Sequence, residues 1–126
     1  MATVFGPMSL GEMIDELEKV RDKDACVVFD WCDMEPSEFR SYRGYYEHLV
    51  IVPAGNIMDN TVKSFLNKCK DCVGKTFTGY KGGDFRMGRK TPVWIGYPSR
   101  ATGYGVEAVE EDTYGRIILK TRKYVD

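Results

Sequence analysis

The chain has 126 residues, and its 43% hydrophobic and 29% charged content is that of one ordinary globular domain covering residues 1–126. No apolar run approaches the roughly 18 residues of a membrane-spanning helix, and the amino-terminal segment lacks the pattern of a secretory signal. A net charge of −1 argues against binding to long nucleic acid, because such proteins carry a basic excess. The four cysteines are expected to be reduced thiols in a cytosolic setting.

The charge is unevenly distributed along the chain. Residues 1–62 hold twelve acidic against five basic side chains, whereas residues 63–100 hold nine basic against two acidic ones. A local positive field in a nearly neutral protein suits a small anionic ligand or an acidic face of a partner subunit. The plainer interpretation is that most of these cations are individually solvated on the surface.

An amphipathic helix is predicted from Ser9 onward, because Ser9 and Glu12 have the spacing of a capping box. The apolar side chains that follow at helical spacing are Leu10, Met13, Ile14, Leu17 and Val20. This pattern predicts a helix that packs on the core.

A short strand is predicted over residues 26–31, and carboxylates gather at its end. Asp30, Asp33 and Glu35 could bind a divalent metal or act as acid and base. Their spacing matches no metal-binding loop, so we expect solvated surface acids, no metal site and no catalytic residue.

Residues 36–46, PSEFRSYRGYY, combine arginines with tyrosines. Arg40 and Arg43 carry planar guanidinium groups suited to phosphate, and Tyr45 offers a ring. The segment is either a second ligand-contacting segment or a loop whose tyrosines cover the edge of the core. A strand follows over residues 48–52 and is expected to end at Pro53.

A second helix is predicted to begin at Asp59 or Asn60 as its N-cap and to end before Gly74, in the left-handed conformation. Cys69 and Cys72 fall on its apolar face, so we expect two buried thiols. A zinc site would need two further ligands at suitable spacing.

Residues 75–94, KTFTGYKGGDFRMGRKTPVW, concentrate glycines, aromatic rings and cations. Adjacent glycines let backbone N–H groups approach a ligand, rings can stack a base, and Lys or Arg can hold phosphate. The plainer interpretation is a hairpin with a two-residue type I′ turn at Gly82-Gly83 and aromatic pairs across its strands. The residues alone leave both interpretations open.

The remaining chain predicts strands over residues 91–97, 106–109 and 116–121, with a polar loop over 98–105 and a turn over 110–115. Short connections between these strands favour antiparallel pairing. The predicted fold class is therefore α+β, a single antiparallel β-sheet with two helices packed on it.

The segments SYRGYYEHL (41–49), GYKGGDFRM (79–87) and TPVW (91–94) resemble a family of small phage proteins, the first type of anti-Thoeris sponge described. The resemblance covers residues 36–94. It implies a protein without catalysis or cofactor that sequesters cyclic ADP-ribose isomers made by bacterial TIR-domain immune enzymes. Some members also bind cyclic oligonucleotides at a separate site. It further implies homo-oligomers, from dimers to hexamers, in the cytoplasm of an infected bacterium.

On this hypothesis the ligand has a purine, two riboses and a pyrophosphate. Aromatic rings would stack the base, cations and glycine N–H groups would face phosphate, and an aspartate would accept ribose hydroxyls. The residues expected to bind it are Arg40, Arg43, Tyr45, Tyr80, Lys81, Gly82, Gly83, Asp84, Phe85, Arg86, Arg89 and Trp94.

Two alternatives belong to other functional classes. One is a nucleotide-processing enzyme in which Asp30, Asp33 or Glu35 acts as acid, base or metal ligand. The other is a phage interaction protein with no small ligand, for which charge reversal at Arg43 and Lys81 would leave every ligand assay unchanged.

Overall fold

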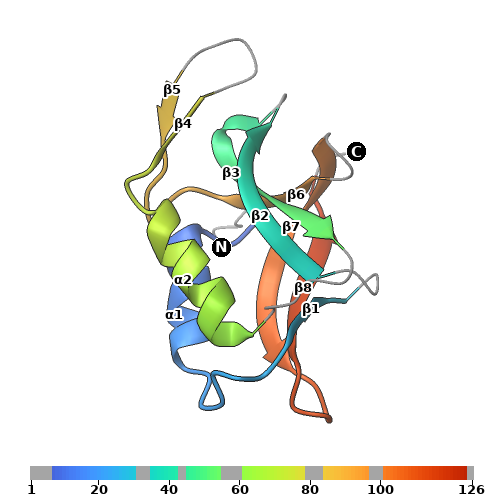
Figure 1. Cartoon of the computed structure of the whole chain (residues 1–126). Helices are drawn as coiled ribbons and strands as arrows, with labels where there is room; N and C mark the ends of the chain where they lie inside the picture. Colours follow the sequence, from blue (N-terminus) through green and yellow to red (C-terminus); the bar gives the residue numbers. More distant parts are fainter. Residues whose placement is uncertain are drawn as a thin grey trace, which may run out of the picture.

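The computed structural model describes residues 7–30, 35–42, 45–54, 61–78, 84–96 and 101–124. Two helices and eight strands follow one another along the chain (Figure 1). Their bounds are α1 Leu10–Glu18, β1 Val27–Phe29, β2 Glu35–Tyr42, β3 Tyr45–Ala54, α2 Val62–Cys72, β4 Thr76–Thr78, β5 Asp84–Arg86, β6 Val93–Gly96, β7 Ala101–Glu111 and β8 Ile117–Lys123. No helix in these ranges combines the length and the apolar content needed to cross a membrane.

The main sheet has six strands in the order β1-β8-β7-β6-β3-β2, and β4 and β5 form a separate two-stranded sheet. The predicted α+β class is confirmed, but the single antiparallel sheet is wrong, because β3 pairs with β6, and β1 with β8, in parallel. The long connection through α2 allows β6 to return beside β3 in the same direction. The predicted antiparallel pairing of the last strands is confirmed for β6, β7 and β8.

The sheet is curled, as the bent path of β2 and β3 in Figure 1 shows. Its two edge strands, β1 and β2, also contact each other, although the described residues form no hydrogen-bonded ladder between them. Buried side chains from both helices and from the sheet form one continuous core. Leu49, Ile51, Val93, Ile95 and Leu119 line its sheet side, and all are at most 1% exposed.

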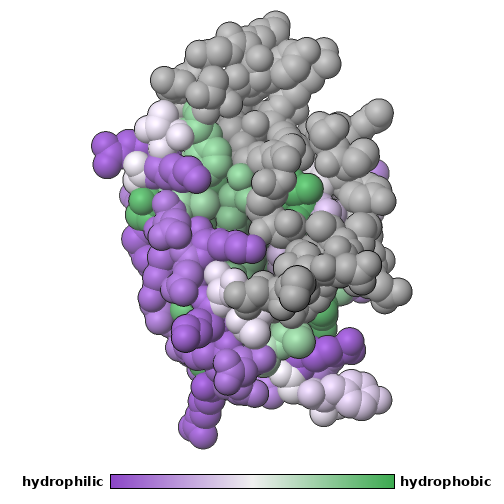
Figure 2. Space-filling model, in the orientation of Figure 1, coloured by the Kyte–Doolittle hydropathy of each residue, from purple (hydrophilic) through white to green (hydrophobic). Residues whose placement is uncertain are grey.

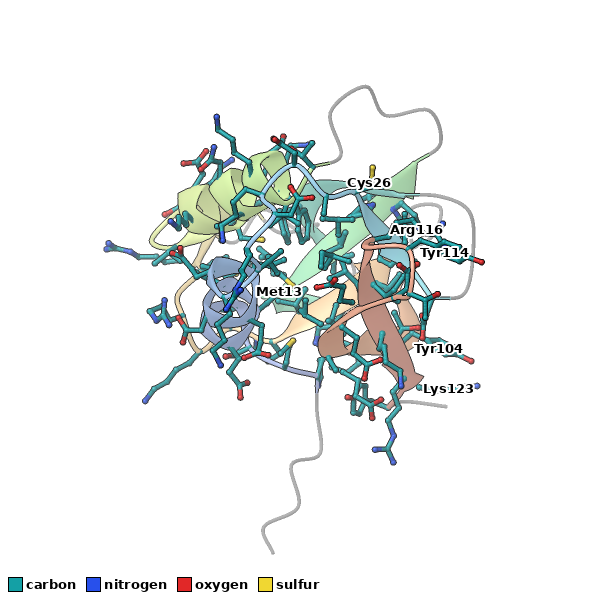
Figure 3. All side chains as sticks on the ribbon, turned by 90° about the horizontal axis from the view of Figure 1, so that it is seen from below. Met13, Cys26, Tyr104, Tyr114, Arg116 and Lys123 are labelled. Atoms are coloured by element: carbon teal, nitrogen blue, oxygen red, sulfur yellow. The ribbon has the colours of Figure 1, made fainter. Side chains whose placement is uncertain are left out.

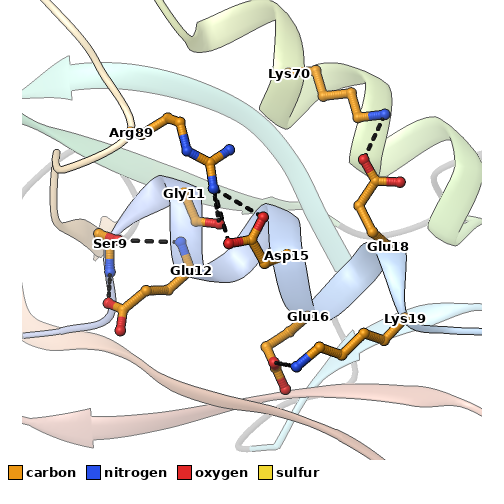
Figure 4. Close-up of polar contacts among 9 residues, drawn as sticks. All are labelled: Ser9, Gly11, Glu12, Asp15, Glu16, Glu18, Lys19, Lys70 and Arg89. Atoms are coloured by element: carbon orange, nitrogen blue, oxygen red, sulfur yellow. Dashed lines mark hydrogen bonds and ion pairs between the residues drawn. The ribbon is translucent and has the colours of Figure 1, made fainter.

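Helix α1 begins as the sequence predicts. The Ser9 side chain accepts from the Glu12 backbone N–H, and the Glu12 carboxylate accepts from the Ser9 N–H, which completes the capping box (Figure 4). The next backbone donors are also satisfied, because Leu10 N–H bonds to Thr91 O at 2.8 Å and Gly11 N–H bonds to Arg89 O at 2.7 Å. Figure 3 shows Met13 on the side of α1 turned toward the strands.

Helix α2 packs its apolar face on the core through Val62, Phe65, Leu66, Cys69 and Cys72. Figure 2 shows hydrophilic side chains covering the outer side of the helical layer. The predicted cap was wrong, since Thr61 is the N-cap and accepts from Ser64 N–H at 3.2 Å; Asp59 and Asn60 lie outside the described residues. The predicted left-handed glycine is confirmed at Gly74, with φ of 81°.

Several strand boundaries also differ from the sequence prediction. Residues 36–42, treated as a loop, belong to β2 and pair with β3, which continues through Pro53 to Ala54. Residues 101–105, also predicted as loop, begin β7, where Gly105 is paired with Trp94 of β6. In both segments the strand is stabilised by its cross-strand neighbours, so local composition did not show it.

The turn between β7 and β8 is confirmed, but it is shorter than the predicted 110–115, because Glu110 and Glu111 belong to β7. The Asp112 carboxylate accepts from Tyr114 N–H at 2.8 Å, Arg116 N–H at 2.9 Å and Arg116 Nε–H at 2.8 Å. Gly115 supplies the positive φ that the turn needs, at 81°. Tyr114 and Arg116 therefore lie on the surface at this turn (Figure 3).

Candidate functional site

The two segments that the sequence suggested for ligand binding, residues 36–46 and 75–94, contribute strands that contact each other in the structure. β2 contacts β4, and β3 contacts β5, although more than 30 residues separate β2 from β4 in the chain. Figure 1 shows the β4–β5 hairpin beyond the end of α2. The backbone of Arg40 lies in β2, that of Tyr45 in β3, and those of Asp84 and Phe85 in β5. Five other expected ligand residues lie outside the described ranges: Arg43, Tyr80, Lys81, Gly82 and Gly83.

The hairpin interpretation of the glycine-containing stretch is confirmed, but not its predicted turn. β4 and β5 are antiparallel, with Thr78 opposite Asp84, so five residues connect the last pair rather than two. The register places Phe77 opposite Phe85, so the aromatic pair expected directly beside the glycines is wrong. The register therefore does not bring Tyr80 opposite Phe85.

One face of the hairpin combines an aromatic ring with a cation. Phe77 packs against the core, and Lys75 Nζ lies 5.2 Å from the centroid of its ring. Lys75 is exposed and forms no ion pair with any described residue. The sequence identified Lys75 among the cations of this stretch but not among the ligand residues. The signal that could have included it is its two-residue spacing from Phe77, which places both on one face of a strand.

Arg86 lies on the opposite face of the hairpin. It is paired with Thr76, and strand alternation turns these two residues away from the face of Phe77 and Met87. Met87 is 1% exposed and anchors the hairpin to the core. Arg86 is exposed and has no ion pair within the described part of the chain. The expected grouping of Arg86 with the stacking ring is therefore not supported by the strand register.

Arg89 has a partner within the chain. Its Nη2 donates to Asp15 Oδ1 at 2.8 Å, Asp15 Oδ2 at 2.9 Å and Gly11 O at 3.3 Å (Figure 4). These bonds hold the turn at residues 88–91 against the amino-terminal end of α1. We therefore leave Arg89 out of the site proposed below.

Trp94 is placed where its ring is covered. Its neighbours Val93 and Ile95 point into the core, so alternation puts Trp94 on the other face of the sheet. It is 6% exposed, packs with Val50, and meets the Tyr124 ring edge-on at a centroid distance of 6.1 Å. A ring in this position has little free surface for a base, and we leave it out of the site as well.

The carboxylate considered first for catalysis also has partners. Asp30 accepts from Thr121 N–H at 3.1 Å and from the Thr121 hydroxyl at 2.8 Å, which ties the end of β1 to β8. Asp33 lies outside the described ranges, and the Glu35 side chain is likewise not described. Within the described residues, no three His, Cys, Asp or Glu side chains are grouped as a metal site would require.

The two cysteines of α2 are buried, as the sequence predicted: Cys69 is 0% and Cys72 is 4% exposed. Desolvation by burial raises the pKa of the Cys69 thiol well above its usual value, and the charge of Cys72 adds to this. Desolvation also raises the pKa of the Cys72 thiol, to about 11. Both are therefore protonated at neutral pH and poor nucleophiles or metal ligands.

This burial predicts a specific loss of stability in alkali. A thiol whose folded pKa is raised favours the native state below its unfolded pKa of about 9, and that contribution disappears as pH rises toward 11. Urea unfolding between about pH 8 and 11 should show a steeper decline for the wild-type chain than for Cys72→Ala. Equal slopes in both chains would contradict the raised pKa of this thiol.

The backbone contacts between β2 and β4 and between β3 and β5, together with the exposed Lys75 beside Phe77, define the candidate site. It can offer an anionic ligand a cation, the part of the half-buried Phe77 ring that stays accessible, and strand ends from two hairpins. No protein-family model, curated protein or solved structure matches this chain.

Proposed function

We propose that the protein binds a cyclic ADP-ribose isomer without altering it and so blocks TIR-based anti-phage signalling. The single observation that carries the proposal is the contact between the two hairpins whose sequences hold the expected cations and rings. The family resemblance of these segments gives the ligand class. We propose that the site lies beside Lys75 and Phe77 and is completed by residues of the β2–β3 and β4–β5 connections.

The chemistry of this site suits a nucleotide-like anion. A cation resting on a ring offers a charge for pyrophosphate next to a surface for a base. Sequestering a signal present at nanomolar to micromolar levels requires a binding free energy of roughly −8 to −12 kcal/mol. Stacking contributes about 1–3 kcal/mol per base, and each hydrogen bond to a charged group about 1.5–3 kcal/mol, so a few such contacts reach this range.

The proposed partner is thus a small signalling molecule, with no long nucleic acid, membrane or cofactor involved. We further propose that the protein acts as a homo-oligomer in the cytoplasm of the infected bacterium. A cyclic oligonucleotide bound at a separate site belongs to the same proposal, because it is implied by the same resemblance.

The test incubates the purified protein with the product mixture of a TIR-domain enzyme, removes free small molecules, and heats the complex. Mass spectrometry of the released material should recover a cyclic ADP-ribose isomer with unchanged mass. Recovery of a cleaved product would instead indicate the enzyme alternative, and folded protein that releases no nucleotide would indicate the interaction protein.

A substitution at Lys75 tests the location of the site. Lys75→Gln should weaken ligand binding by about 10- to 100-fold, because it removes a charge-assisted contact to phosphate. Lys63→Gln is the matched control, since it removes the same charge from the exposed face of α2. Isothermal titration of both variants should leave Lys63→Gln at the wild-type affinity. Wild-type affinity in Lys75→Gln would place the ligand elsewhere.

A further inference from the structure

An acidic groove runs between α1 and β7. Two hollows of about 430 and 350 Å³ adjoin there and share Glu16, Lys19 and Val109 in their walls. Apolar side chains contribute to the lining in both, including Val20 and Met8. The groove is therefore a formed concave surface with an apolar component, separate from the hairpins of the candidate site.

Carboxylates from both elements stand along this groove: Glu12, Asp15 and Glu16 on α1, and Glu107, Glu110 and Glu111 on β7. Four of the six already have ion pairs within the chain: Asp15 with Arg89 at 2.8 Å, Glu16 with Lys19 at 2.8 Å, Glu107 with Arg122 at 3.4 Å and Glu110 with Lys120 at 3.8 Å. These pairs are solvent-exposed, and such pairs are weak enough to be exchanged for other cations. Glu111 is exposed and has no ion pair with a described residue.

The same chain carries a surface of opposite charge. Arg86 on β5 and Lys90 in the following turn are both exposed and have no ion pair in the described ranges. They belong to residues 63–100, a segment that contains nine basic and only two acidic side chains. Arg86 lies on the hairpin face turned away from Phe77, so it is not needed for the ligand site beside Lys75.

We infer that the groove between α1 and β7 is an interface for a second copy of this chain, which inserts the Arg86 face of its β4–β5 hairpin. Charge complementarity within one sequence identifies the occupant, because the chain supplies both the acidic groove and the basic hairpin. In a twofold dimer each copy gives its hairpin to the groove of the other, so every contact is made twice. The inference rests on the homo-oligomer of the proposed function and names its interface, and it does not depend on which ligand the protein binds.

The test measures self-association by sedimentation velocity and native mass spectrometry. The wild-type chain should associate, and more weakly as salt rises, since exposed charges are screened. Arg86→Glu and Glu111→Lys should each weaken association by about tenfold or more, because attraction becomes repulsion at both copies of the contact. When the two variants are mixed, the hetero-dimer should recover near wild-type affinity. One of its two contacts then pairs Arg86 with Glu111 as in the wild type, and the other pairs the two substituted side chains, whose charges are again opposite.

Lys63→Glu is the control for net charge, since it makes the same charge change on α2, outside the hairpin. It should associate like the wild-type chain, and circular dichroism should show that all variants are folded. A wild-type chain that stays monomeric would overturn the inference and leave the groove to a different protein. An oligomer whose affinity is unaffected by either reversal, or two variants that fail to associate when mixed, would overturn it equally.

Discussion

Replacing Phe65 with alanine is expected to lower the free energy of unfolding by about 3–5 kcal/mol. Phe65 is 3% exposed in the first turn of α2, and its ring stacks on that of Phe39 in β2 at a centroid distance of 5.7 Å. The substitution removes both the buried apolar area and the ring contact, and the surrounding core can close the cavity only in part. A loss of this size is a large fraction of the stability of a small domain.

Chemical denaturation of three variants, Phe65→Ala, Phe65→Leu and Asn67→Ala, measures this loss and compares it with a smaller change at the same position and with a change on the exposed face of the helix. Leucine keeps most of the volume and should cost clearly less than alanine, whereas Asn67 is exposed on the same helix and should change stability little. The Phe39 contact also links α2 to the strand that leads into the candidate site. A cost below about 1 kcal/mol for Phe65→Ala would contradict the packing described here.

Replacing Gly11 with alanine is expected to destabilise the protein, although alanine is the better helix former. A Cβ at Gly11 would lie 2.9 Å from both Arg89 Cβ and Arg89 O, so the turn at residues 88–91 would have to move. That turn is fixed by the 2.7 Å bond from Gly11 N–H to Arg89 O and by the Arg89–Asp15 ion pair. Overpacking costs about 1–3 kcal/mol, against a gain in helix propensity of at most about 1 kcal/mol.

The matched control is Gly88→Ala, in the same turn. A Cβ at Gly88 would meet nothing within 4 Å, and its φ lies outside the left-handed region. This variant should be neutral or slightly stabilising, because it restricts the unfolded chain without a clash. Thermal melts of the two variants should therefore shift in opposite directions or differ by several degrees. If Gly11→Ala were as stable as the wild-type chain, the close approach of α1 to this turn would be wrong.

The candidate site was partly visible in the sequence. The hairpin around residues 75–87 was one of two interpretations left open by the sequence, and Gly-Gly with its flanking strand residues was the local signal for it. The contacts of β2 with β4 and of β3 with β5 were not predicted. Segments so far apart in the chain leave no mark of their contact on local composition. Arg89 is a second example. The basic, glycine-containing sequence around it suggested that it binds phosphate, whereas its partner in the structure is Asp15, 74 residues earlier in the chain.

The sequence by itself determined the two helices and the antiparallel order of β6, β7 and β8. Helical periodicity and caps act within a few residues, and short connections leave strands only one way to pair. Tertiary structure alone decided that β3 lies parallel to β6 and β1 parallel to β8. It also decided that residues 36–42 form a strand and that Trp94 is buried. These features depend on which distant segments cover a given strand, and burial and ladder bonds are set by those neighbours rather than by the residues themselves.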